Sequence, residues 1–527
     1  MTVAQTLLDS PAGLKWKTIG LRHHHGVCLP LFSLHSQTSG GIGEYLDLIP
    51  MIRWCKTIGM DVIQLLPLND TGQEPGPYNA ISSVALNPIH LSLHALPFFE
   101  KVPSAEEKLA HLRQWNTSYR VNYSLIRDWK ASFLWSYYQA VFSDFSQSND
   151  YQTFLKNNRW VEPYGLFKAL KESQGWRSWE EWPAALKNPS PAGYEALMQE
   201  YLPVIQFHSF LQYFCYQQFL EVRAVAEKEG VLLKGDVPIL IARDSADVWY
   251  EPSNFLLEMT AGAPPDTYSD VGQNWGSPIY NWDALKKKNY QWWKDRLGVA
   301  GSFYQLYRID HVVGFYRIWT IPSGSSPQKG AFLPADQALW IPHGEEIMKM
   351  MLESSPMLPI GEDLGVVPKE VRKSLAQLGI CGTKVMRWER RWETDKGFIP
   401  VGEYSPISMT TVSTHDSDTL QEWWKHSPKE AKEFADYKKW PYEPFLSKEH
   451  HQEILRDSHH SGSLFHINLL QEYLALFPEL ISKNLNDERI NIPGKVLATN
   501  WTYRFKPSVE EITQHTALQE VIKALIA

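Results

Sequence analysis

The chain contains little cysteine and no long apolar run. Cysteine accounts for 4 of the 527 residues, and these are widely separated, with no Cys-x-x-Cys spacing. We therefore expect reduced, buried thiols rather than a disulfide framework. No run of about 18 apolar residues occurs, so no membrane-spanning helix is expected. The first twenty residues lack the basic and apolar regions of a secretory signal peptide. These absences predict a cytoplasmic protein with no membrane partner.

An excess of positive charge is also lacking. The 51 Lys and Arg residues are outnumbered by 59 Asp and Glu residues, which gives a formal net charge of −8. Because contact with nucleic-acid phosphates requires a basic surface, nucleic acid is excluded as the main partner. The chain also has no visible internal repeat and no low-complexity tract.

Aromatic residues, by contrast, are plentiful. The chain has 22 Trp residues, and Phe, Trp and Tyr together make up 13% of it. Its 43% hydrophobic and 21% charged residues are ordinary for a soluble globular protein. Sugar rings present apolar C–H faces, against which aromatic rings pack well. Most of the Trp residues are nevertheless expected in the core, so the composition is compatible with a carbohydrate site without requiring one.

A short apolar segment at 303–309 reads as a strand that ends in Arg308, Asp310 and His311. Arg308 and Asp310 are two residues apart, so in an extended strand both side chains point to the same face. An adjacent guanidinium keeps a carboxylate ionised, and an ionised carboxylate is what a covalent carboxylate nucleophile requires. A purely structural ion pair at a strand end would produce the same pattern, so this motif does not decide the matter alone.

Two further apolar segments end in carboxylates. The segment at 357–361 leads into Glu362 and Asp363, and the segment at 409–414 leads into His415 and Asp416. The acids of the three motifs are about fifty residues apart, which suits strands one or two βα units apart in a barrel with ~30 residues per unit. The C-terminal ends of parallel barrel strands meet on one open face, so the three acids are expected to converge there.

Strand and helix patterns alternate along the rest of the chain. This alternation predicts an α/β fold, a (β/α)8 TIM barrel, as a single catalytic domain over residues 1–527. The eight predicted strands are at 26–33, 61–68, 231–242, 303–309, 357–361, 382–388, 410–414 and 495–501.

The parallel pattern stops between the second and third strands. Residues 91–205 are charged, aromatic and mostly helical in period, and they are too many for a barrel loop. We predict a helical insertion subdomain here, and the pattern indicates no function for it. Two Gly- and Pro-rich segments, 69–87 and 262–280, are predicted to be long loops at the C-terminal face.

The three motifs resemble the amylomaltase family, the 4-alpha-glucanotransferases of glycoside hydrolase family 77, which are related to the α-amylases. The matching stretches are RIDH at 308–311, GEDLG at 361–365 and STHDSDT at 413–419, and the resemblance covers most of the chain. It implies that Asp310 is the nucleophile, Glu362 the acid/base and Asp416 the acid that distorts the sugar and stabilises the transition state. It also implies retaining transfer of α-1,4-glucan segments through a glycosyl–Asp310 intermediate.

The same resemblance implies no cofactor and no bound metal. The partners that it implies are malto-oligosaccharides, maltose and glucose, and in the same way glycogen, starch or other glucans. It supplies a set of sugar-contacting residues as well. These are Tyr78, Asp236, Asp266, Gln273, Trp275, Arg308, His311, Asp363, His415 and Asn491.

Asp236 is notable even without the family resemblance. A buried acid inside an apolar strand lowers the stability of the fold by several kcal/mol unless it is paired. Asp236 either supports the floor of the site or bonds a neighbouring Arg. The segments 27–35 and 65–71 look closer to the plant cytosolic disproportionating enzyme that handles maltose. That relative has starch-binding modules and a long insertion that are missing here, so the preferred donor and acceptor stay open.

Three other readings remain. An α-1,4-glucan hydrolase of the same clan fits the motifs equally, because the sequence does not reveal whether an acceptor sugar outcompetes water. A metal-dependent barrel hydrolase could use the histidines at 23–25 and 450–460, although these are expected to be solvated surface residues. A non-catalytic glycan-binding protein is disfavoured by the presence of all three acids. The sequence says little about oligomerisation, and a monomer is the default expectation.

Overall fold

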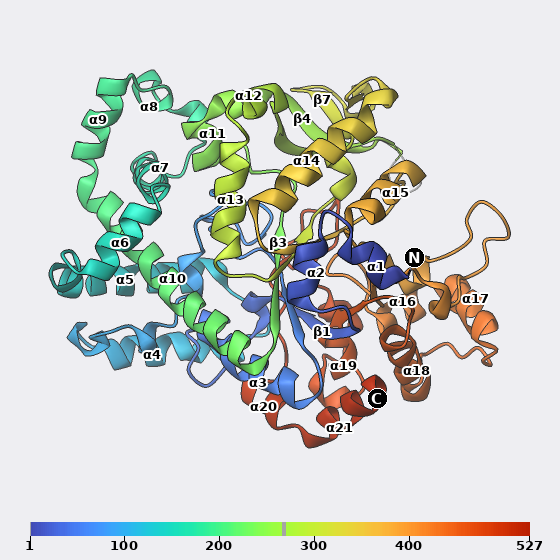
Figure 1. Cartoon of the computed structure of the whole chain (residues 1–527). Coiled ribbons are helices and arrows are strands. Elements are labelled where there is room, and N and C mark those ends of the chain that lie inside the picture. The colour runs from blue at the N-terminus through green and yellow to red at the C-terminus, as the bar shows by residue number, and fades with distance from the viewer. Residues whose placement is uncertain (1, 266–269) are drawn as a thin grey trace.

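Eight parallel strands form the centre of the computed structural model, which describes residues 2–265 and 270–527 (Figure 1). Their order around the sheet is β10-β11-β12-β1-β2-β3-β6-β9. The strands are β1 (His24–Leu29), β2 (Val62–Leu65), β3 (Leu232–Val237), β6 (Leu306–Ile309), β9 (Leu358–Gly361), β10 (Gly382–Val385), β11 (Ser408–Thr411) and β12 (Phe465–Leu469).

The sheet closes on itself. Strand β1 pairs in parallel with β12, in a register that sets His24 opposite Phe465. At the two ends of the order, a parallel bridge between Ile360 and Cys381 joins β9 to the start of β10. α-Helices separate most successive barrel strands along the chain, with two short 3-10 turns between β10 and β11, and the predicted (β/α)8 barrel is confirmed.

The predicted eighth strand is wrong. Residues 495–501 form neither a helix nor a strand, and the eighth strand is β12 instead. The apolar Val496 and Leu497 suggested a buried strand, yet Val496 is fully exposed. In β12, the polar His466 and Asn468 alternate with apolar residues and are themselves completely buried, which hid the strand from an apolar-run criterion.

The first three strands are shorter than predicted. They end at Leu29, Leu65 and Val237, whereas the apolar runs continue for several more residues. A proline follows within two residues in each case: Pro30, Pro67 and Pro238. Proline has no N–H group to donate to a strand partner, so each proline limits the ladder.

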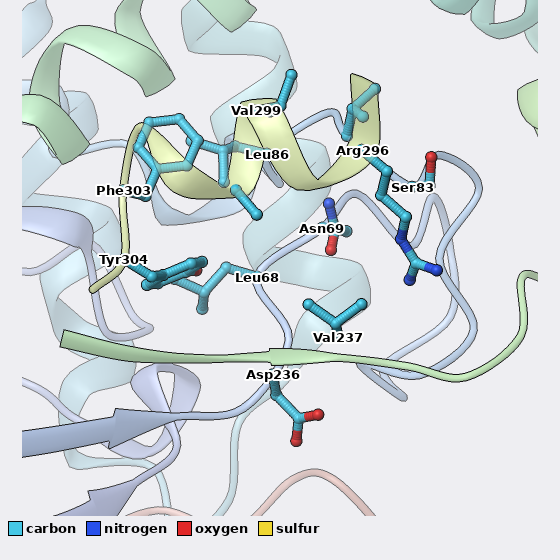
Figure 2. A pocket seen from close by; sticks show the side chains of 12 residues that line it. Leu68, Asn69, Ser83, Leu86, Asp236, Val237, Arg296, Val299, Phe303 and Tyr304 are labelled. Carbon is cyan, nitrogen blue, oxygen red and sulfur yellow. The ribbon is translucent and has the colours of Figure 1, made fainter. Parts of the chain in front are cut away.

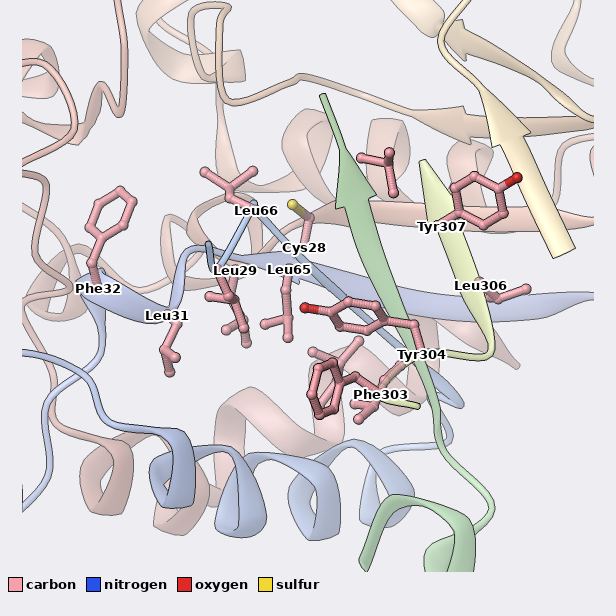
Figure 3. Close-up of a cluster of buried hydrophobic side chains, with 14 of the residues drawn as sticks. Cys28, Leu29, Leu31, Phe32, Leu65, Leu66, Phe303, Tyr304, Leu306 and Tyr307 are labelled. Carbon is pink, nitrogen blue, oxygen red and sulfur yellow. The ribbon is translucent and has the colours of Figure 1, made fainter. Parts of the chain in front are cut away.

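The core lies between the strands and the helices around them. Leu29 and Leu65, from β1 and β2, are fully buried, as are Leu306 and Tyr307 of β6. Figure 3 shows these side chains beside Phe303 and Tyr304, which precede β6. The covering helices include α3 (Leu48–Thr57), α10 (Leu202–Glu229), α13 (Gln291–Gly301), α14 (Trp340–Ser354), α15 (Lys369–Leu378), α16 (Leu420–His426) and α18 (Lys448–His459).

Between β2 and β3 the described chain is helical, without a strand, over the segment for which an insertion was predicted. Figure 1 shows these helices, in cyan and green, projecting to one side of the barrel before α10 returns towards β3. The helices are α4 (Ala105–Arg113), α5 (Tyr123–Phe145), α6 (Asn149–Asn157), α7 (Val161–Ser173), α8 (Ala184–Lys187) and α9 (Pro191–Glu200).

A buried ion pair ties the insertion to the barrel. Lys130 of α5 donates to Glu44 at 2.5 Å and to the carbonyl oxygens of Ile89 and Leu91 at 2.8 and 2.9 Å. Both charged side chains are only 1% exposed. Glu44 lies just before α3, so the contact joins α5 to the first βα connection of the barrel.

Lys130→Met should therefore lower the free energy of unfolding by about 3–5 kcal/mol, because the carboxylate of Glu44 would stay buried without a counter-ion. Denaturant unfolding followed by circular dichroism measures this. The double variant Lys130→Met/Glu44→Gln removes the orphaned charge and should recover part of the loss. A single variant as stable as the wild type would contradict the role of this pair.

A second, antiparallel sheet in the order β5-β4-β7-β8 lies beside the barrel, near the C-terminal ends of β3 and β6 (Figure 1). It consists of β4 (Phe255–Ala263), β5 (Gln273–Tyr280), β7 (Ile318–Pro322) and β8 (Ala331–Leu333). The prediction of a loop over 262–280 is therefore wrong for its second part, which is β5. The interruptions by Gly and Pro concealed it, and the register of the β4–β5 pair is indeed irregular.

The expectation of surface histidines at 450–460 is wrong for two of the four, whereas His460 is exposed as predicted. His451 and His459 of α18 are buried, at 0% and 2% exposure. His459 bonds His25 of β1 at 2.9 Å, and His466 of β12 bonds His23 at 2.9 Å. Burial lowers the pKa of His25 to about 4 and that of His466 to about 3, and neighbouring histidines add to both shifts. His25 and His466 are therefore neutral at neutral pH, and they lie where β1 and β12 pair.

Two smaller expectations concern cysteine and the membrane. All four cysteines are free and buried, as predicted. Within residues 2–265 and 270–527, no helix is both long and apolar enough to cross a bilayer.

Candidate active site

The predicted catalytic acids follow the C-terminal ends of three barrel strands. Asp310 comes directly after β6, Glu362 directly after β9, and Asp416 follows β11 by a short turn. Asp236, in β3, is buried next to them in the barrel. Parallel strands direct their C-terminal ends to one face, which is why residues so distant in sequence share a site.

Arg308 of β6 joins three carboxylates. Its Nη1 atom is 2.8 Å from Asp310 Oδ1 and 3.0 Å from Asp236 Oδ2, and its Nη2 atom is 3.7 Å from Glu362 Oε2. The Arg308 side chain is 10% exposed, so these charges interact with little screening by water. Burial opposes the charge of Arg308, but the surrounding acids raise its pKa well above the ordinary value, so it stays protonated.

Asp416 is fixed by residues other than Arg308. Asn491 donates to Asp416 Oδ1 at 2.7 Å, and His415 Nε2 lies 3.3 Å from Asp416 Oδ2. The same His415 nitrogen is 3.0 Å from the hydroxyl of Tyr78, which donates to Asp236 Oδ2 at 2.7 Å. A continuous chain of contacts thus runs from Asp416 through His415, Tyr78 and Asp236 to Arg308 and the other two acids.

Glu362 and Asp416 differ in protonation. Burial raises the pKa of Glu362 to about 8, and the Asp310 carboxylate adds to this rise while Arg308 opposes it. Burial also acts on Asp416, but His415, Asn491 and Arg308 outweigh it and hold the pKa of Asp416 well below its usual range. At neutral pH the site therefore has one carboxylic acid that can donate a proton and one firmly ionised carboxylate.

Aromatic rings line the same site. The ring of Tyr78 stacks on His415 at 5.5 Å and lies 5.6 Å from Trp501. On the side of Asp310, Trp275 meets His311 edge to face at 5.1 Å, and Trp275 is 37% exposed. Such rings can pack on the apolar faces of a sugar, while the acids bond its hydroxyl groups.

The comparisons with known proteins agree on one family. The family model described as 4-alpha-glucanotransferase matches residues 29–510. The chain belongs to the 4-alpha-glucanotransferase family. The 4-alpha-glucanotransferase of Chlamydia pneumoniae is 47% identical over 528 residues, covering 100% of this chain and 99% of the relative. That of Chlamydia caviae is 48% identical over 514 residues, covering 97% of this chain and 96% of the relative.

Among solved structures, the amylomaltase from Streptococcus agalactiae in complex with acarbose superposes with a TM-score of 0.81 at 26% sequence identity. The match covers 96% of this chain and 98% of that one. The barrel and the surrounding helices of this 4-alpha-glucanotransferase are thus shared along nearly the whole length of a known family member.

Not all predicted sugar-contacting residues join the contact chain. Gln273 bonds Trp275 at 3.1 Å on β5, beside the site. Asp363 instead accepts from the Thr383 N–H at 2.7 Å and from Arg372 at 2.9 Å, so it braces β10 and α15. Asp266 lies outside the described residues. The sugar contacts of all the predicted residues stay predictions.

Two residues of the site were missed in the sequence. Arg489 donates to Asp418 and to the Asn491 carbonyl, the latter at 2.9 Å, so it holds the two segments that carry Asp416 and Asn491. Trp501 lies 5.9 Å from the His415 ring and has a positive φ of 62°. Asn491, which was predicted as a sugar contact, lies between them in the chain and is the signal that could have led to them.

The small cavity in Figure 2 is a separate feature. It has a volume of about 30 Å³ and is lined by Asn69, Ser83, Val237 and Arg296, among others. Figure 2 shows the Asp236 carboxylate pointing away from these side chains, on the other side of β3. Ligand pockets usually exceed ~300 Å³, so this cavity is too small for a sugar and does not belong to the acids.

The metal-dependent reading finds no support. In the part of the chain that the structure describes, no group of three or more His, Cys, Asp or Glu side chains is arranged to hold a metal ion. Of the histidines that suggested a metal, His25 and His459 bond each other, His23 and His24 bond His466 and Asp61, respectively, and His460 bonds the carbonyl oxygen of Leu525.

Proposed function

We propose that this 4-alpha-glucanotransferase moves α-1,4-glucan segments from a malto-oligosaccharide donor to a glucose or glucan acceptor, with retention at the anomeric carbon. The observation that carries the mechanism is the grouping of Asp310 and Glu362 around Arg308, with burial raising the pKa of Glu362 to about 8. A retaining reaction needs this combination: an ionised nucleophile beside a protonated acid.

In the first step, a carboxylate oxygen of Asp310 attacks C1 of the donor sugar while Glu362 gives its proton to the glycosidic oxygen. The C1–O bond breaks, the shortened chain leaves with a new hydroxyl group, and a glycosyl ester forms on Asp310. In the second step, the ionised Glu362 takes a proton from the acceptor's 4-hydroxyl, which attacks C1. The ester breaks, Asp310 is released as a carboxylate, and Glu362 is protonated again.

Asp416 has a different task. Its ionised carboxylate, fixed by Asn491 at 2.7 Å and by His415 at 3.3 Å, is available to bond sugar hydroxyls that tighten their hydrogen bonds as positive charge develops at C1. Arg308 lies between Asp310 and Asp236 at 2.8 and 3.0 Å, and so it keeps the nucleophile oriented.

Transfer instead of hydrolysis requires an acceptor sugar to displace water at the ester. The β4–β5 hairpin, with Gln273 and the half-exposed Trp275, supports this because it supplies an aromatic surface next to His311 and Asp310. Maltose, glucose and glycogen are within the proposed range of partners. A single catalytic domain with a helical insertion, acting as a monomer, is part of the same proposal. The four free, buried cysteines support a cytoplasmic location.

Incubation with maltotriose alone should yield glucose together with a ladder of longer oligosaccharides, because each enzyme-bound maltosyl or glucosyl unit is passed to another sugar. Chromatography of the products at several times measures this. The same incubation with excess chelator should give an unchanged ladder. Glucose and maltose without any longer product would mean that water is the acceptor, and would replace the proposal with hydrolysis.

A further inference from the structure

The backbone makes an unusual turn immediately after the nucleophile. His311 has a φ of 43°, in the left-handed region that residues other than glycine seldom adopt. Its backbone N–H donates to Glu362 Oε2 at 2.8 Å. The next N–H, of Val312, donates to the backbone oxygen of Glu362 at 3.1 Å. In this turn two successive N–H groups therefore donate to the same residue, Glu362, which follows the neighbouring strand β9.

The two oxygens of the Glu362 carboxyl group have different surroundings. The His311 N–H and the Arg308 guanidinium, whose Nη2 is 3.7 Å away, both approach Oε2. Both groups can only donate hydrogen bonds. A proton on Oε2 would therefore meet a donor, whereas a proton on Oε1 leaves Oε2 free to accept. The carboxylic acid has one favoured arrangement, with the hydrogen on Oε1.

We propose that His311 is a positioning residue whose backbone N–H, presented by the left-handed turn, holds Glu362 Oε2 as an acceptor and so assigns the catalytic proton to Oε1. This rests on the proposed function, in which Glu362 is the acid/base. The side chain of His311 has a separate contact, edge to face with Trp275. The main-chain role and the side-chain role of this residue can therefore be tested independently.

The N–H contact also affects how easily Glu362 loses its proton. Burial, Asp310 and Asp363 favour the neutral form, while Arg308 and the His311 N–H favour the charged form. A hydrogen bond to a charged group is strong enough to lower a pKa by about one unit. Without this N–H the pKa of Glu362 should rise by about one unit, and the proton should be shared between two oxygens, of which one is wrongly directed.

Two variants that both delete the imidazole separate the roles. Glycine adopts the left-handed conformation freely, whereas a β-branched valine resists it. In His311→Gly, kcat should begin to fall at the same high pH as in the wild type. KM should rise, because the contact with Trp275 is lost. In His311→Val this fall should begin about one pH unit higher, and kcat should be about tenfold below that of His311→Gly at neutral pH.

A backbone substitution keeps the test valid if His311→Val does not fold. Incorporating the α-hydroxy analogue of histidine at position 311 replaces the N–H with an ester oxygen and keeps the imidazole. The pKa of Glu362 can be read from its carboxyl band by infrared difference spectroscopy against Glu362→Gln, without any activity. An upward shift of about one unit with KM unchanged is expected.

The outcomes for the two proposals differ. An unshifted Glu362 band in the folded ester variant overturns the role of His311, even if the wild type transfers glucan normally. A shifted band in a protein that makes no maltotriose ladder supports the contact between His311 and Glu362 and counts against the proposed function instead.

Discussion

Asp310→Asn will lower the rate of glucan transfer by about 10⁴–10⁶-fold, the range found when a covalent nucleophile is removed. An amide cannot form the glycosyl ester, so the first step has no route. The fold should be retained, because Arg308 keeps Asp236 as a partner at 3.0 Å when the charge of Asp310 is gone. The measurement is the initial rate of glucose release from maltotriose, together with a thermal melt.

A matched control tests whether the loss is specific to this position. In the described chain, the side chain of Asp295 in α13 has a hydrogen bond only with the exposed Gln291, at 2.7 Å, so Asp295→Asn makes the same chemical change away from the acids. It should transfer at the wild-type rate. If Asp310→Asn were to keep a tenth or more of the wild-type rate, Asp310 could not be the nucleophile.

Glu362→Gln should lower transfer from maltotriose by about 10³-fold, because a general acid contributes 10²–10⁴-fold and this residue acts in both steps. The wild-type rate should also fall as the pH rises through about 8. Burial raises the pKa of Glu362 to that value, and only the form below it can donate a proton. This decrease of the rate above pH 8 should be absent in Glu362→Gln.

A donor sugar whose leaving group needs no proton tests the role of Glu362 as the acid more specifically. Fluoride leaves C1 without needing a proton, so in the first turnover, before the second step requires a base, Glu362→Gln should release fluoride from an α-maltosyl fluoride at a rate within about tenfold of the wild type. Asp310→Asn should not release it, since the nucleophile is still missing. Equal failure of both variants with the fluoride donor would mean that Glu362 is not the acid.

That the three acids proposed as catalytic lie together could be predicted from the sequence, because each follows a barrel strand closely in the chain. A short apolar strand followed directly by a carboxylate marks the end of a barrel strand, and three such motifs at βα spacing must share one face. Asp310 and Glu362 have this form, and Asp416 follows β11 after a short turn. Asp236 also stood out, since an acid in a buried strand requires a partner, and Arg308 is that partner at 3.0 Å.

The features that could not be predicted depend on contacts between distant segments. Strand β12 was missed because His466 and Asn468 are polar. Their hydrogen bonds to distant residues, among them Ser458 of α18, His23 and Val412, make them compatible with burial. The orientation of Asp363 is decided by Thr383 and Arg372, both outside its motif. The left-handed turn at His311 had no sequence signal at all, because histidine there replaces the expected glycine.

The pairing of β1 with β12 has a consequence for how the chain matures. These two strands lie more than four hundred residues apart, yet they are neighbours in the sheet. During synthesis at ~5–20 residues per second, β1 therefore waits for roughly 20–90 seconds before its second partner leaves the ribosome. The helices of 91–205 make contacts closer in sequence and can assemble earlier. A nascent chain of this enzyme thus carries an incomplete barrel with unpaired strand edges, which favour aggregation, until almost the last tenth of it has been translated.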